Sequence, residues 1–180
     1  MTIYSSIQHS IPLIHARTNA VRVMAGMLVL FSMLLPQQVL AAVSCSVTAT
    51  GPAFGIYNPL NVSPTLANSS ISATCTLVSG GTTTINLVSS YSAGNSGSFV
   101  SRSMKSGTNV LSYNLYFDAA YTQIRGDGTG GSQVGGGSLT LTTASRTQSV
   151  PTSTIYGRIP AGQDVAPGSY SDTIVVTVTY

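Results

Sequence analysis

Charged side chains are scarce in this 180-residue sequence: they make up only 6% of the residues, and glutamate is absent. Globular chains usually carry about 25%, and helices in particular expose Glu, Lys and Arg on their outer faces. Ser, Thr and Gly take the places that charges usually occupy, and Thr and Val favour strands. The composition therefore disfavours a helical fold and predicts an all-β one.

Histidine is missing from most of the chain, since His9 and His15 both lie near the N-terminus, and the sequence has no tryptophan. Without a histidine, a general base would have to be Lys105 or one of the scattered aspartates. No serine lies in a Gly-x-Ser-x-Gly elbow, and no cluster of His, Cys or carboxylates suits a metal. We expect no enzyme, no cofactor and no metal site. The four acidic residues are Asp118, Asp127, Asp164 and Asp172.

Long runs of basic residues are absent as well. The formal charge is +3, but it includes Arg17 and Arg22 in an N-terminal segment that we expect to be removed. From residue 43 onward, five basic residues face four aspartates, so 5 − 4 leaves +1. A nucleic-acid-binding protein would need a basic patch or stripe, and we expect no nucleic-acid partner.

Residues 1–42 have the pattern of an export signal. Arg17 and Arg22 supply positive charge, an apolar run covers 23–35, and the small residues Ala41 and Ala42 offer a cleavage site. A bilayer-spanning helix needs about 20 apolar residues, so the 13-residue run predicts no permanent membrane anchor. We expect a single exported domain, residues 43–180.

Only two cysteines occur, Cys45 and Cys75, and both lie in the expected exported domain. Two cysteines outside the reducing cytoplasm most simply form one disulfide. A metal pair or a reactive thiol are the alternatives. Both cysteines also fall on the apolar face of an alternating segment, where a bridge between strands or between sheets would lie.

Apolar and polar residues alternate with period two along much of the domain, a pattern typical of half-buried strands. Gly- and Pro-containing turns separate the segments, as in a sandwich or barrel. The expected strands cover 43–50, 71–77, a segment from 85, 98–104, 111–117, 139–141, 152–159 and 170–180.

The last strand places Ile174, Val176, Val178 and Tyr180 on one face, and no Lys or Pro interrupts it between 173 and 180. Ordinary secreted domains protect a sheet edge with charges or prolines. A domain that receives a strand from another chain would leave it open. Burial of about four apolar side chains by an inserted strand would contribute roughly 6–12 kcal/mol before entropy costs.

Four stretches then resemble a known family: 54–60, 111–120, 156–163 and 167–178. Their order and spacing are similar to the spore coat protein U domain family, which includes subunits of archaic, Csu-type chaperone–usher pili. The positions that carry the likeness are Phe54, Gly55, Tyr57, Pro59, Leu60, Tyr113, Asn114, Tyr116, Asp118, Gly168, Tyr170 and Asp172.

The resemblance implies an incomplete immunoglobulin-like β-sandwich that lacks its final strand and is completed by a donor strand. It implies three partners: a periplasmic pilus chaperone, an outer-membrane usher and other pilin subunits. The groove for the donor strand would run beside Ile174, Val176, Val178 and Tyr180. The implied function is a structural subunit of a surface fibre that supports adhesion and biofilm formation, located on the pilus or outside the cell.

Two departures from the family pattern stand out. Cleavage near Ala42 would leave almost no donor arm before Cys45, which predicts a fibre tip or a non-elongating subunit. Arg125 stands where the family often has Trp, and it opens an Arg-Gly-Asp tripeptide that we interpret as a turn instead of an integrin-binding site. Two other functions stay open: a tip or surface-binding adhesin module, and a secreted coat or matrix protein.

Overall fold

The computed structural model describes residues 2–8, 40–150 and 153–180, so the predicted apolar run at 23–35 lies outside the described residues. In the described ranges, no helix has the length and apolar character needed to cross a bilayer. The elements are β1 (Thr2–Gln8), β2 (Ala42–Ala49), β3 (Thr65–Ser79), β4 (Thr83–Tyr91), the 3₁₀ turn η1 (Gly94–Ser96), β5 (Arg102–Ser106), β6 (Asn109–Tyr116), β7 (Gly135–Leu141), β8 (Thr147–Ser149), β9 (Ser153–Ile159) and β10 (Thr173–Thr179).

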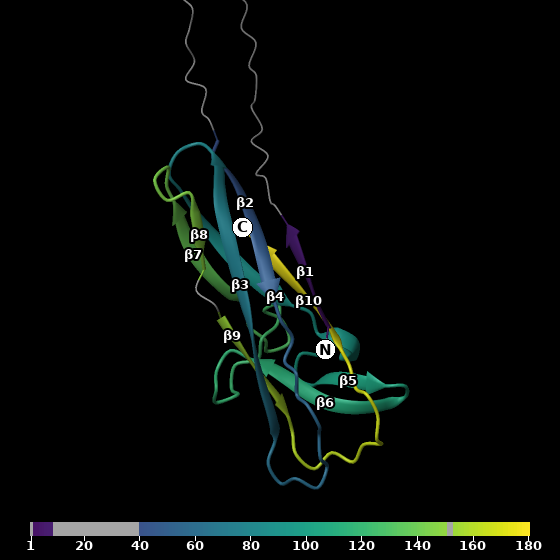
Figure 1. The fold of residues 1–180 in the computed structure, drawn as a ribbon. Helices are drawn as coiled ribbons and strands as arrows, with labels where there is room; N and C mark the ends of the chain where they lie inside the picture. Colours follow the sequence, from purple (N-terminus) through teal and green to yellow (C-terminus); the bar gives the residue numbers. More distant parts are fainter. Residues whose placement is uncertain (1, 9–39, 151–152) are drawn as a thin grey trace, which may run out of the picture.

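The strands form two sheets that enclose one core (Figure 1). The first sheet has the order β1-β10-β4-β7, and the second has the order β2-β3-β9-β6-β5 with β8 added beside β3. The named strand pairs are antiparallel except β1–β10, which is parallel. The predicted all-β sandwich is confirmed.

Period-two alternation decides which side chains enter the core. In β10, Ile174, Val176 and Val178 are almost fully buried while Thr173 and Val175 are exposed. The second half of β3 repeats the pattern. The fully buried apolar side chains come from both sheets and include Cys75, Leu77, Tyr91, Tyr113, Leu115, Leu141, Ile155, Ile159, Ile174 and Val176.

Several strand boundaries differ from those expected. β3 begins at Thr65, before the predicted 71, because its first half pairs with β9. β5 begins at Arg102 and not at 98, and it turns into β6 through Gly107, whose φ of 59° is the left-handed conformation that glycine favours. β8 was not predicted, because three polar residues carry no alternation signal. β1 was not predicted either, since its residues were assigned to the export signal.

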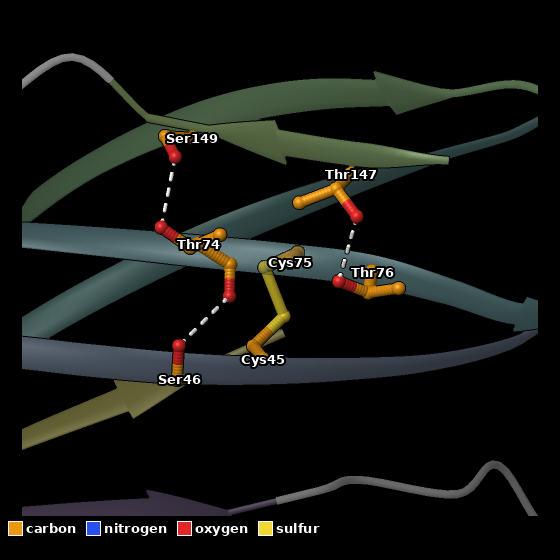
Figure 2. The surroundings of a disulfide bond; sticks show 7 residues. All are labelled: Cys45, Ser46, Thr74, Cys75, Thr76, Thr147 and Ser149. Atoms are coloured by element: carbon orange, nitrogen blue, oxygen red, sulfur yellow. Dashed lines mark hydrogen bonds between the residues drawn. A yellow bond between two sulfur atoms is a disulfide. The ribbon is translucent and has the colours of Figure 1, made fainter. Parts of the chain in front are cut away.

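The two cysteines are joined in a disulfide that links β2 to β3 (Figure 2). Cys45 lies directly opposite Cys75 in the antiparallel register, with their Cα atoms 4.0 Å apart. The bond therefore joins neighbouring strands of one sheet. Hydroxyl contacts surround it: Thr74 bonds Ser149 at 2.8 Å and Thr76 bonds Thr147 at 3.0 Å, which ties β8 to the other side of β3.

Candidate strand-acceptor site

The candidate site is the outer edge of β10. Along the edge that faces the rest of its sheet, β10 pairs with β4 from Val176 to Thr179. The predicted groove residues Ile174, Val176 and Val178 are 0%, 0% and 2% exposed, and Tyr180 is partly buried against the core. The structure therefore places the first three residues on the inward face of β10, with Tyr180 packed against the core just beyond the end of the strand. Their role in binding a donor strand stays a prediction.

The outer edge of β10 is occupied by β1 of the same chain (Figure 1). The parallel register runs without a shift from Thr2 opposite Thr173 to Gln8 opposite Thr179, so every residue of β10 has a partner. We expected this edge to be open in a domain of residues 43–180. The strand that fills it belongs to the segment predicted as a removable signal, so the edge would be free once that segment is gone.

Backbone groups of alternate β10 residues point to opposite neighbours, as in any strand. The amide of Ser92 donates to the carbonyl of Val175 at 2.9 Å, and the amide of Val175 donates to Ser92 Oγ at 2.9 Å. The backbone amide and carbonyl of Val175 therefore point toward the β4 side of the strand. By alternation, the backbone groups of Ile174, Val176 and Val178 face outward to β1 and form the acceptor row.

Asp172 lies immediately before β10 and is 2% exposed. Its Oδ2 accepts a hydrogen bond from the hydroxyl of Tyr113 at 2.6 Å, and its Oδ1 accepts from the amides of Asn95 at 2.9 Å and Thr173 at 2.7 Å. Burial, together with this hydrogen bond to a carboxylate, raises the pKa of the Tyr113 hydroxyl. Gly94 packs so closely that a Cβ at that position would collide with the carboxylate.

Arg102, on β5, is fully buried and fixes Ser92 from the opposite sheet. Its Nε and Nη2 donate to the carbonyl of Ser92 at 3.2 and 3.0 Å, and Nη2 also donates to the carbonyl of Arg125 at 2.6 Å. Its Nη1 donates to Asn114 Oδ1 at 2.7 Å. Burial lowers the pKa of Arg102, but the guanidinium stays charged because its ordinary pKa is far above neutral.

Arg125, the departure from the family pattern, is also buried, at 1% exposed. Its guanidinium lies 3.9 Å from the ring centroid of Phe117 and 5.3 Å from that of Tyr91. It donates to the carbonyl of Thr154 at 2.7 Å and to the hydroxyl of Ser153. The Arg-Gly-Asp tripeptide therefore has its arginine inside the protein, as expected for a turn and not for an integrin-binding loop.

The loop that carries Phe54 and Tyr57 lies at one end of the sandwich. Phe54 packs edge-on against Tyr113, with ring centroids 5.9 Å apart, and the hydroxyl of Tyr57 donates to the carbonyl of Pro160 at 3.1 Å. Beside it runs a groove of about 780 Å³, lined by Phe54, Ile56, Pro59, Met104, Val165, Pro167 and Tyr170 among others. Ile56, Leu60 and Val62 project from the loop at 95%, 88% and 96% exposed.

The remaining family positions serve separate local contacts. Tyr116 packs against Tyr121 with centroids 5.5 Å apart, and Asp118 accepts from the amides of Thr122 and Gln123. Gly55 has a φ of 70°, Pro59 lines the end groove, and Gly168 lies against Ser106. The hydroxyl of Tyr170 donates to the carbonyl of Ala166 at 2.7 Å.

Sequence reasoning missed Arg102, Ser92, Gly94 and Asn95 as residues that hold β10. The strand prediction over 98–104 did place Arg102 in a strand, but a lone arginine in an alternating segment reads as a surface residue. Among the residues that the structure describes, no group of three or more His, Cys, Asp or Glu could hold a metal.

Sequence comparisons with known proteins agree with the resemblance. A family model described as Spore Coat Protein U domain matches residues 32–177. Protein U of Myxococcus xanthus is 33% identical over 136 residues, which cover 71% of this chain and 70% of that protein. A solved structure, the CsuC–CsuE chaperone–tip adhesion subunit pre-assembly complex from archaic chaperone–usher Csu pili of Acinetobacter baumannii, aligns at 19% identity with a TM-score of 0.43. The alignment covers 77% of this chain and 40% of that one.

Proposed function

The chain belongs to the Spore Coat Protein U domain family, and on that premise we propose that it is a structural subunit of a secreted chaperone–usher fibre. In this proposal, β10 is completed by a strand from another polypeptide after the N-terminal segment is removed. The observation that carries the proposal is the β10 edge, which takes a full-length strand from a segment remote in sequence. The resemblance to archaic pilus subunits adds the setting in which strands are exchanged.

Without β1, the outer edge of β10 would expose a row of unpaired backbone N–H and C=O groups. Residues 173–180 contain no charge and no proline, the two devices that most often block edge pairing. An incoming strand would form main-chain hydrogen bonds with the acceptor row of Ile174, Val176 and Val178. Such a domain is stable only when paired, so its natural partners are a periplasmic chaperone, an outer-membrane usher and neighbouring subunits.

The proposal includes further expectations that follow from the sequence. The domain of residues 43–180 is exported to the cell surface, where the fibre supports adhesion and biofilm formation, and its short donor arm assigns it to a tip or non-elongating position. It is not an enzyme, since the domain has no histidine and its aspartates lie in separate loops.

A second candidate function is a surface-binding module at the fibre tip. The exposed apolar side chains Ile56, Leu60 and Val62 favour it, since they lie on one loop beside the end groove. Contiguous exposed apolar surface often marks an interaction site. This reading keeps the same strand-acceptor edge and adds a contact at the end of the sandwich.

Photo-cross-linking in the producing cells tests strand acceptance. A benzophenone amino acid replaces Val175, which points outward from β10 and is 40% exposed; the matched control carries it at Val110, 48% exposed on the β5–β6 hairpin. We expect Val175 to capture another polypeptide and Val110 not to. Capture confined to Thr2–Gln8 of the same chain, where Tyr4 lies opposite Val175, would refute the proposal.

A further inference from the structure

The acceptor strand is held in two different ways along its length. From Val176 to Thr179 it lies in an antiparallel ladder with β4. β4 itself stops at Tyr91, and one further backbone hydrogen bond, from the amide of Ser92 to the carbonyl of Val175, extends the pairing, which leaves Thr173 and Ile174 without a partner from β4. An edge strand fixed along only half of its length would fray at the other half, and a frayed strand presents no regular row of backbone groups to a partner.

A backbone bridge between Ser171 and Lys105 of β5 precedes β10, and two buried polar clamps then hold its first half. In the first, Asp172 is bonded to Tyr113 on β6 and to the amide of Asn95 in η1. In the second, Ser92 makes two hydrogen bonds to Val175 while its own carbonyl accepts two from Arg102 on β5. Both clamps therefore tie the start of β10 to β5 and β6 of the second sheet.

The two clamps converge through the hairpin. Arg102 lies opposite Tyr113 in the β5–β6 register, and the next residue, Asn114, accepts from Arg102. Asn114 in turn donates to the carbonyls of Phe99 and Val100, at 2.7 and 3.1 Å. All four polar side chains of this unit are at most 4% exposed: Arg102, Tyr113, Asn114 and Asp172.

Nothing in ordinary core packing requires this arrangement. Burying an arginine and an aspartate costs free energy unless each is well hydrogen-bonded, and apolar residues of similar size would fill the same volume. What these groups supply is directional hydrogen bonding to two particular points, Ser92 and the residues flanking Thr173. Both points lie where β10 extends past the last residue of β4.

We propose that Asp172, Tyr113 and Arg102 are positioning residues that hold the first half of β10 extended, so that the full acceptor row exists before a strand arrives. The inference rests on the proposed function for its purpose, and on the described contacts for its mechanism. It implies that strand capture begins on a preformed edge along the whole of β10, and not on the second half alone.

The test uses Tyr113→Phe in the full chain, which removes one hydroxyl and keeps the ring. Its matched control is Tyr170→Phe, which removes a hydroxyl bonded at a similar distance to Ala166 outside the clamps. Residue-resolved amide hydrogen exchange is the first readout. We expect exchange at Thr173 and Val175 to become about tenfold faster or more in Tyr113→Phe, with Thr179 unchanged, and neither to change in Tyr170→Phe.

Asp172→Asn is a second variant, which keeps one acceptor oxygen for Tyr113. We expect it to speed amide exchange at Thr173 and Val175 less than Asp172→Ala does. A uniform increase in exchange over all of β10, or no increase at Val175, would overturn the inference. These outcomes do not depend on any partner strand.

Capture by the benzophenone at Val175 is the second readout, and it separates the two proposals. If the parent chain captures a partner and Tyr113→Phe captures it several-fold more slowly, both stand. If the parent captures and both tyrosine variants match it, the positioning role is wrong while the proposed function survives. If the parent captures nothing, the proposed function fails, and the exchange pattern alone decides whether the clamps hold β10.

Discussion

Removal of the Cys45–Cys75 disulfide is expected to destabilise the protein by an amount that follows from its position. The bond closes a loop with a sequence separation of 30. In the chain-entropy treatment, a loop of this length restricts the unfolded chain enough to stabilise the fold by about 3.5 kcal/mol. Most single domains have only about 5–15 kcal/mol in total, so the loss is a large fraction.

The location of the bond adds a structural consequence. β2 is the edge strand of its sheet and has β3 as its neighbour there, so the disulfide pins an edge strand at its centre. Without the bond, β2 depends on ladder hydrogen bonds and on its half-buried Val43 and Val47. We therefore expect β2 to open more often than the strands at the centre of the sheet.

Urea denaturation of the full chain measures the effect. The difference between oxidised and reduced protein isolates the cross-link, and the Cys45→Ala/Cys75→Ala variant, compared with the reduced protein, isolates the packing of the two sulfurs. We expect the midpoint to fall on reduction by the equivalent of about 3–4 kcal/mol. Superimposable curves for oxidised and reduced protein would refute the reasoning, since they would mean that the bond does not constrain the unfolded chain.

Two further predictions concern Arg125 and Asp118. Arg125→Lys keeps the charge but loses the planar fork that reaches Thr154, and we expect a loss of about 2–3 kcal/mol by urea denaturation. The control is Arg146→Lys, at an exposed arginine that also donates to the carbonyls of Leu77 and Val78, and we expect a loss of about 1 kcal/mol or less there; equal effects would contradict the burial argument. Hydrogen bonds from the backbone amide of Gln123 and from Thr122 hold the pKa of Asp118 below 3.8, its ordinary value. The stabilisation that ionised Asp118 gives to the folded state is therefore present above that value and is lost as the pH falls through the lowered pKa. An NMR titration of the Gln123 amide should have its midpoint below 3.8, and a midpoint at or above 3.8 would contradict this prediction.

The apolar inward rows of β3 and β10 could be predicted from sequence because each depends only on a period of two. Ile174, Val176 and Val178 repeat at every second position, and between them lie the exposed Val175 and the half-buried Thr177. β8 could not be predicted in the same way, since Thr147–Ser149 is a strand only because Thr74 and Thr76 of β3 lie beside it. Whether this segment forms a strand depends on its pairing with β3 and not on its own residues.

Arg102 and Arg125 illustrate the limit more sharply. An arginine in a sparsely charged sequence is expected at the surface, yet both lie in the interior. Each is stabilised there by oxygen atoms from other segments of the chain: the carbonyl of Thr154 for Arg125, and the carbonyl of Arg125 and the side chain of Asn114 for Arg102. No local sequence pattern predicts contacts between distant segments, so the clamps on β10 could be identified only from the tertiary structure.

The sequence by itself determined the fold class, the inward face of β10 and of the second half of β3, the place of the two cysteines on apolar strand faces and the uncharged character of the last strand, because these follow from composition, period and chain chemistry. Tertiary structure alone decided that Cys45 and Cys75 lie in one sheet, that β4 stops short of the start of β10, and that Thr2–Gln8 lies along its outer edge. The physical reason is that a strand edge is defined by which other segments reach it, and that depends on contacts between residues distant in the chain.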